Sequence, residues 1–240
     1  MNVIIKHGIF LLAAVQFVKC GVLPVEKCNL EDSACMTSAF QQALPTFVAG
    51  LPDHGVEVMD VLDLDDFAFD LSGLQFTLKE GKLKGLKGAV IDNVKWDLKK
   101  KNIEVDFHLD ATVKGHYTAG GRILILPITG DGQMKLKLKN IHIHLVVSYE
   151  MEKDAEGVDH VIFKKYTVTF DVKDNAQFGL TNLFNGNKEL SDTMLTFLNQ
   201  NWKQVSEEFG KPVMEAAAKK IFKNIKHFLA KVPIAEIANV

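Results

Sequence analysis

The chain has 240 residues, of which 47% are hydrophobic and 24% are charged, and its formal net charge is −2. These values are ordinary for a globular protein, and the mildly acidic balance argues against binding of nucleic acid or strong attraction to an anionic membrane surface. The length suits one large domain or two small ones. No Pro/Gly/Ser-rich linker, charge block or internal repeat divides the chain, so we expect a single domain over residues 23–240.

The first residues have the pattern of a secretory signal peptide. A basic start precedes an apolar run over Gly8–Val18, which is too short to span a bilayer. Val18 and Cys20 are small enough for positions −3 and −1 of a cleavage site. We therefore expect residues 1–22 to be a signal peptide cleaved near residues 20–22, which predicts a secreted, extracellular protein without a membrane span.

Three cysteines are present, and removal of the signal peptide would leave Cys28 and Cys35. Acylation at Cys20, as in a lipoprotein, is disfavoured because Lys19 stands where a small residue is needed. An even number of cysteines in an oxidising compartment favours a disulfide. A zinc site on the same pair lacks further ligands, since two thiolates do not fill a tetrahedral shell. We therefore predict a disulfide between Cys28 and Cys35, ahead of a helix.

After the two cysteines, apolar residues first recur with helical spacing and then alternate with polar residues. Apolar residues such as Met36, Phe40 and Phe47 recur every three or four positions over residues 32–51, which predicts a helix that Pro45 kinks. Alternating apolar and polar residues then predict strands. These strands cover residues 67–71, 74–78, 90–98, 103–117, 122–129, 134–149 and 161–172.

The connections between these strands have the composition of tight turns. Residues 99–102 would join two long strands, and Gly130-Asp131-Gly132 supplies the positive φ that a hairpin needs. Strands joined in this way pair with their sequence neighbours. We therefore expect a long antiparallel meander with one apolar face.

The apolar pattern changes phase inside the sixth of these strands. Apolar side chains share one parity at Met134, Leu136 and Leu138 and the other at Ile141, Ile143, Leu145 and Val147. A one-residue shift turns every later side chain to the opposite face unless a bulge absorbs it. We therefore predict a bulge near Lys139 or Asn140, and with it a curved sheet that could wrap around a helix.

Two amphipathic helices are predicted at the C-terminal end. Asn185 or Asn187 would cap the first helix, and Gly210 with Pro212 would end it. The second would begin at Pro212. Its small residues over 216–218 would let strands approach closely or leave space for a ligand.

A one-sided sheet of this length needs a cover, and one or two helices leave a void unless the side chains are large. This makes a carrier of an apolar molecule the first hypothesis, with ordinary core packing as the alternative for each residue. Met and aromatic side chains adapt well to a chain-like ligand, and Tyr117, Thr129 and His116 are considered for its polar end. The candidate ligand-binding residues are Phe47, Phe67, Phe76, Trp96, Val105, Phe107, Leu109, Met134, Leu136, Phe170, Met194, Phe197, Trp202 and Met214.

The sequence offers no constellation typical of catalysis. None of its serines lies in a G-x-S-x-G elbow. His142 and His144 share a strand face, but with no carboxylate at metal spacing they are interpreted as an exposed polar face. The acidic residues between Asp60 and Asp70 lack the Gly and bidentate Glu of a calcium loop. We therefore expect no catalytic residues, no metal and no cofactor.

Several short motifs, taken in order, resemble one family. Besides the cysteine pair, the motifs are Leu51-Pro52, Met59-Asp60, Ile125-Leu126-Pro127-Ile128-Thr129-Gly130, Asn182-Leu183-Phe184-Asn185-Gly186-Asn187 and Phe197-Leu198-Asn199-Gln200-Asn201-Trp202. Their order and spacing are similar to those of the takeout proteins and the related juvenile hormone binding proteins of insects, over nearly the whole mature chain. The resemblance implies an α+β fold in which a long, strongly curved antiparallel sheet wraps around a long C-terminal helix and encloses an apolar tunnel, as in tubular lipid-binding proteins.

The cysteine count bears on the branch of this family. Hormone-binding relatives carry a second disulfide, for which this chain has no cysteines. That departure favours the takeout branch and puts juvenile hormone itself in doubt as the ligand. We therefore expect a secreted, monomeric, non-enzymatic carrier of a long terpenoid, prenyl or fatty-acyl molecule. The alternatives are a secreted signalling module that meets a receptor and holds lipid as a structural plug, and a secreted lipid hydrolase.

Overall fold

The computed structural model describes residues 22–239, so the predicted signal peptide lies outside the described residues apart from Val22. The helices are α1 (Ser33–Ala49), α2 (Lys188–Gln200), α3 (Trp202–Lys231) and α4 (Ile234–Ile237). The strands are β1 (Cys28–Asn29), β2 (Val61–Asp63), β3 (Phe67–Leu71), β4 (Leu74–Lys84), β5 (Val90–Asp97), β6 (Asn102–Ile123), β7 (Leu126–Lys153), β8 (Asp159–Leu180) and β9 (Ala238–Asn239).

Strands β2 to β8 form one antiparallel sheet in the order β2-β4-β6-β7-β8, with β3 beside β4 and β5 beside β6. The predicted meander is confirmed from β6 to β8. It is wrong for β4 and β5, which do not pair with each other. Strand β6 has 22 residues, long enough for β5 to pair with residues 102–108 and β4 with residues 112–121 of the same strand.

The turn predicted at Gly130-Asp131-Gly132 is wrong, because β7 runs straight through these residues. The chain reverses instead at Leu124 and Ile125, inside the predicted strand 122–129, and Leu124 takes a positive φ of 54°. Gly130 and Gly132 are required instead because no side chain fits at either position. A Cβ on Gly130 would lie 2.4 Å from the Tyr117 hydroxyl, and one on Gly132 would lie 2.5 Å from the backbone oxygen of Thr181, just after β8.

The predicted bulge in β7 is confirmed. The pairing of β7 with β8 shifts register between Lys139 and Ile141, and Asn140 has a φ of 52°. A carboxylate oxygen of Asp110 on β6 accepts the Asn140 backbone N–H at 2.8 Å. The neighbouring pairs β4–β6 and β6–β7 also shift register. Because bulges bend strands and increase twist, this row of irregularities curves the sheet.

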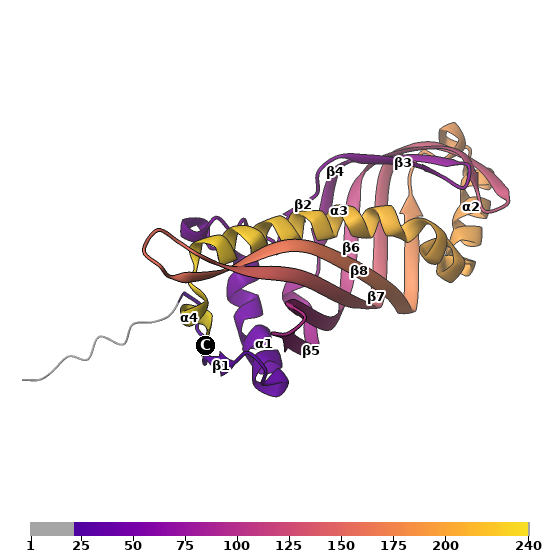
Figure 1. Ribbon diagram of the computed structural model, residues 1–240. Helices are drawn as coiled ribbons and strands as arrows, with labels where there is room; N and C mark the ends of the chain where they lie inside the picture. The colour runs from indigo at the N-terminus through magenta and orange to yellow at the C-terminus, as the bar shows by residue number, and fades with distance from the viewer. Residues whose placement is uncertain (1–21, 240) are drawn as a thin grey trace, which may run out of the picture.

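The curved sheet closes around α3, which runs along its inner side (Figure 1). Both β3 and β8, which lie toward opposite sides of the sheet, contact α3. Helix α1 covers a different region, at β5. There the Thr37 hydroxyl accepts the Val94 backbone N–H at 2.9 Å, and the Gln41 side chain accepts the N–H of Ile91 at 2.8 Å. The predicted α+β fold, with a long antiparallel sheet and a long C-terminal helix, is confirmed.

The predicted division of the C-terminal helices is wrong in position. The cap is confirmed, since the Asn187 side chain accepts the N–H of Leu190, but the first helix ends at Gln200 and α3 then continues through Gly210 and Pro212. A Cβ on Gly210 would lie 2.7 Å from the Phe170 ring, so this glycine allows close contact with β8. We attribute the tolerance of Pro212, which costs about 3 kcal/mol in a helix interior, to that packing. Within residues 22–239, no helix combines the length and apolarity needed to cross a membrane.

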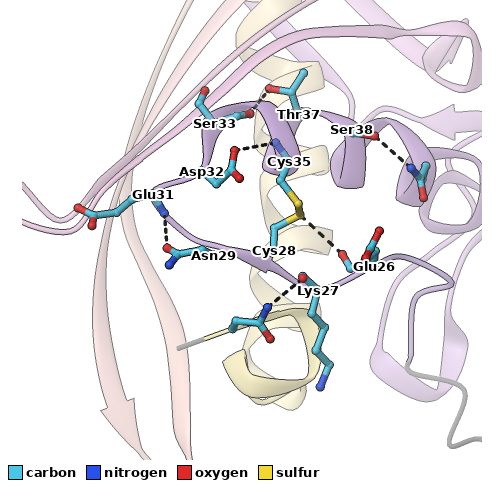
Figure 2. The surroundings of a disulfide bond; sticks show 12 residues. Glu26, Lys27, Cys28, Asn29, Glu31, Asp32, Ser33, Cys35, Thr37 and Ser38 are labelled. Atoms are coloured by element: carbon cyan, nitrogen blue, oxygen red, sulfur yellow. Dashed lines mark hydrogen bonds between the residues drawn. A yellow bond between two sulfur atoms is a disulfide. The ribbon is translucent and has the colours of Figure 1, made fainter.

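The predicted disulfide is present between Cys28 and Cys35, whose Cα atoms lie 5.7 Å apart (Figure 2). It joins β1 to the first turn of α1, where the Asp32 side chain caps the helix by accepting the Cys35 backbone N–H at 3.0 Å. Cys28 also pairs with Ala238 in a parallel bridge between β1 and β9. The disulfide and the β1–β9 pairing together hold the start of the described chain against α1 and the C-terminal strand.

Candidate functional site

The main feature of the interior is an elongated apolar cavity between the sheet and α3. Its volume is about 180 Å³, which is room for roughly six water molecules at liquid density. Strands β3, β4, β6, β7 and β8 supply one wall, and α3 supplies the other with Val205, Phe209, Val213, Met214 and Ile221. A space of this kind excludes charged groups and suits an extended hydrocarbon.

Strand alternation explains why one wall is so uniformly apolar. Alternate residues of β6 from Phe107 to Val113 point inward, and those of β7 do so on both sides of the bulge. Met134, Leu136 and Leu138 before the bulge line the same cavity as Ile141, Ile143 and Leu145 after it. The extra residue at Asn140 thus keeps both phases of the pattern on one face.

Seven of the predicted ligand-binding residues lie together in this lining. They are Phe76, Phe107, Leu109, Met134, Leu136, Phe170 and Met214. They come from β4, β6, β7, β8 and α3 and so lie around the whole circumference of the cavity. This grouping makes the cavity the candidate ligand site.

The other seven do not line the cavity. Five of them belong to neighbouring parts of the core, namely Phe47, Trp96, Val105, Met194 and Phe197. Phe47 on α1 packs edge-on against Phe228, with ring centroids 5.4 Å apart, and Trp96 packs against Tyr149 at 5.3 Å. Trp96 lies on β5, which α1 contacts, and Val105 on β6 pairs with Val94 of β5. The alternating strands therefore supply apolar side chains both to the cavity beside α3 and to the part of the core next to α1.

The remaining two, Phe67 and Trp202, line a groove between β3, β8 and α3. This groove shares Tyr166, Phe170 and Met214 with the cavity. Its outer rim carries charges of both signs, including lysines and glutamates of α3. The groove is thus the place where the cavity approaches the surface, at the seam where the curved sheet meets α3.

Two polar side chains interrupt the lining among the described residues. Ser206 on α3 is only 8% exposed, and its hydroxyl has no hydrogen-bond partner there. Tyr166 on β8 lies near the seam against Phe222, with ring centroids 4.4 Å apart, and its burial raises the pKa of the phenol. An unpaired buried hydroxyl costs about 1–3 kcal/mol, so Ser206 is the group to which a polar atom of a ligand would bind favourably.

The polar residues considered from the sequence lie elsewhere. Tyr117 is fully buried, donates its hydroxyl to the Thr181 backbone oxygen at 2.8 Å, and has its pKa raised to about 12 by burial. His116 lies 2.7 Å from an Asp131 carboxylate oxygen, and Thr129 is exposed. Sequence reasoning missed Ser206, although its position among Trp202, Val205 and Phe209 in an apolar helix stripe was a usable signal.

Comparison with known proteins agrees with this architecture. The protein named circadian clock-controlled protein daywake of Drosophila melanogaster is 27% identical over 231 residues, which cover 89% of this chain and 86% of the relative. Juvenile hormone-binding protein of Manduca sexta is 25% identical over 177 residues, or 71% of this chain and 72% of the relative. The model of the haemolymph juvenile hormone binding protein family matches residues 9–239. The chain therefore belongs to the haemolymph juvenile hormone binding protein family, as the sequence motifs predicted.

Proposed function

We propose that this protein is a secreted, non-enzymatic carrier that binds one long terpenoid, prenyl or fatty-acyl molecule in the cavity between the sheet and α3. The observation that carries this proposal is the almost wholly apolar lining, drawn from five strands and α3. The name of the Manduca sexta relative states that it binds juvenile hormone, so a small-molecule ligand is proposed for this chain as well. The disulfide between Cys28 and Cys35 supports an extracellular location.

The energetics of such a site are sufficient for useful affinity. Burial of a chain of about 15 carbons contributes on the order of 12 kcal/mol at about 0.8 kcal/mol per carbon. Association costs about 4–15 kcal/mol in lost freedom. Dissociation constants in the micromolar to nanomolar range are therefore expected for a chain of this length that occupies the cavity and continues into the adjoining groove. The seam lined by Phe67 and Trp202 provides the route of entry.

The proposal predicts that affinity rises with ligand length. A series of fatty acids and their esters should bind with affinities that increase by at most about tenfold for every ~2 methylenes, until the cavity is full. Fluorescent-probe displacement measures the affinities, and mass spectrometry of the recovered esters should find them intact. Ester turnover that tracks protein concentration would identify a hydrolase instead. A co-purified lipid that does not exchange with added ligand would favour a signalling module with a structural plug.

A second prediction concerns the unpaired hydroxyl in the cavity wall. Ser206→Ala should weaken binding of a long-chain alcohol or ester by about 3- to 15-fold, the range of one neutral hydrogen bond. Binding of the matching hydrocarbon should stay unchanged, because only the polar ligand loses a partner. Ser38→Ala, on the exposed side of α1, is the control and should affect neither ligand. Equal loss for both ligands would show that Ser206 contributes packing rather than a hydrogen bond.

A further inference from the structure

We propose that Asp92, His108 and His142, on the outer face of the sheet, bind a divalent transition-metal ion such as Zn²⁺ or Cu²⁺. One potential ligand atom from each residue lies within 4.8 Å of those of the other two. The three residues come from β5, β6 and β7 and are brought together only by strand pairing. The site is separate from the apolar cavity and independent of the carrier function.

The strand register places the two imidazoles side by side. His108 and His142 are directly opposite each other in the β6–β7 pair, and their rings stack with centroids 5.0 Å apart. Asp92 reaches them because the β5–β6 pairing shifts register between Ile91 and Asn93. Its carboxylate oxygens lie 2.8 and 2.9 Å from Nδ1 of His108. The bulge in β5 thus turns a carboxylate toward a histidine pair.

The donor set and its spacing match a transition metal. Two imidazole nitrogens and one carboxylate oxygen form a ligand set typical of zinc sites that keep a fourth position for water. Bonds of about 2.0–2.2 Å around a tetrahedral ion place ligand atoms roughly 3.3 Å apart. The side chains of Asp92 and His108 are 38% and 33% exposed, so they are free to make the small rotations that close the set. Magnesium and calcium prefer oxygen ligands and fit this set poorly.

Strand β8 places an ion pair on the far side of the two histidines. Asp171 on β8 is the register partner of His142, and its carboxylate forms an ion pair with Lys173, so it adds little net charge to the site. On the inner face of the same strands, Phe107 and Ile141 line the cavity. A bound ion would therefore link three strands directly behind the cavity wall and stabilise the folded chain by mass action.

Metal titration of the purified protein tests this site. The protein should carry no affinity tag, because a histidine tag would itself bind metal. Isothermal titration calorimetry with Zn²⁺ should show one ion per chain, and Mg²⁺ or Ca²⁺ should give no binding. His108→Ala and His142→Ala should each weaken Zn²⁺ binding more than tenfold. Electron paramagnetic resonance of the Cu²⁺ form should show coupling to two imidazole nitrogens in the wild type and to one in either variant.

His116→Ala is the matched control, because His116 lies further along the same strand pair and faces Asp131 instead of a second histidine. It should leave Zn²⁺ affinity within twofold of the wild type. Thermal unfolding without metal confirms that all three variants fold, and added Zn²⁺ should raise the Tm of the wild type and of His116→Ala only. Absence of stoichiometric binding, or affinity unchanged in His108→Ala and His142→Ala, would overturn the proposal.

Discussion

Ala217→Phe is expected to lower the affinity for a long-chain ligand by ten- to a hundredfold. Ala217 lies on α3 in the cavity lining, where the space is only about 180 Å³. A phenyl ring there would displace about two to three ligand methylenes. Each contributes about 0.8 kcal/mol of burial, so the loss falls within the stated range. Probe displacement should show the largest losses for the longest ligands, because short chains can still occupy the remaining space.

Ala230→Phe provides the matched control. Ala230 lies on the same helix but is exposed and does not line the cavity. The same substitution there should leave affinity within about twofold, and thermal unfolding of both variants checks that each is folded. Equal affinity of a folded Ala217→Phe variant and the wild type would place the ligand outside this cavity.

Removal of the disulfide is expected to lower stability by about 2.5 kcal/mol. Cys28 and Cys35 are separated by seven positions, and the chain-entropy relation gives this value for so short a loop. For a chain of this size, the Tm of a Cys28→Ala/Cys35→Ala double variant should fall by about 5–10 °C. Ligand affinity should change little, because neither cysteine lines the cavity.

Reduction of the wild type supplies the control for this variant. A reducing agent should lower the wild-type Tm to nearly the same value and leave the double variant unchanged. Alkylation of the unreduced protein should label neither Cys28 nor Cys35. Two free thiols in that experiment would contradict the disulfide and weaken the inference of secretion.

Patterns among residues close in sequence predicted the strand bulge and the helix cap. The phase change after Leu138 predicted a bulge near Lys139 or Asn140, where the register shifts, because side chains in a strand alternate strictly and one face must stay buried. The sequence also narrowed the N-cap to Asn185 or Asn187, and Asn187 makes the capping bond, which lies within one turn. The turn at Gly130 and the helix end at Gly210 and Pro212 were wrong. Gly130 lies against Tyr117 on β6 and Gly210 against Phe170 on β8, so both glycines are required by residues far away in sequence.

The sequence by itself determined the inward and outward faces of the strands, the cysteine pair and the family, because these depend on period, composition and the order of short motifs. Only the tertiary structure decided which apolar residues share a cavity. Phe107 lines it, whereas Trp96 and Val105, on the same face of the sheet, lie in a neighbouring part of the core, where Trp96 packs against Tyr149. The strand register likewise decided that Asp92 meets His108 and His142. Alternation specifies a face, but the helix that covers it depends on the closure of the whole sheet.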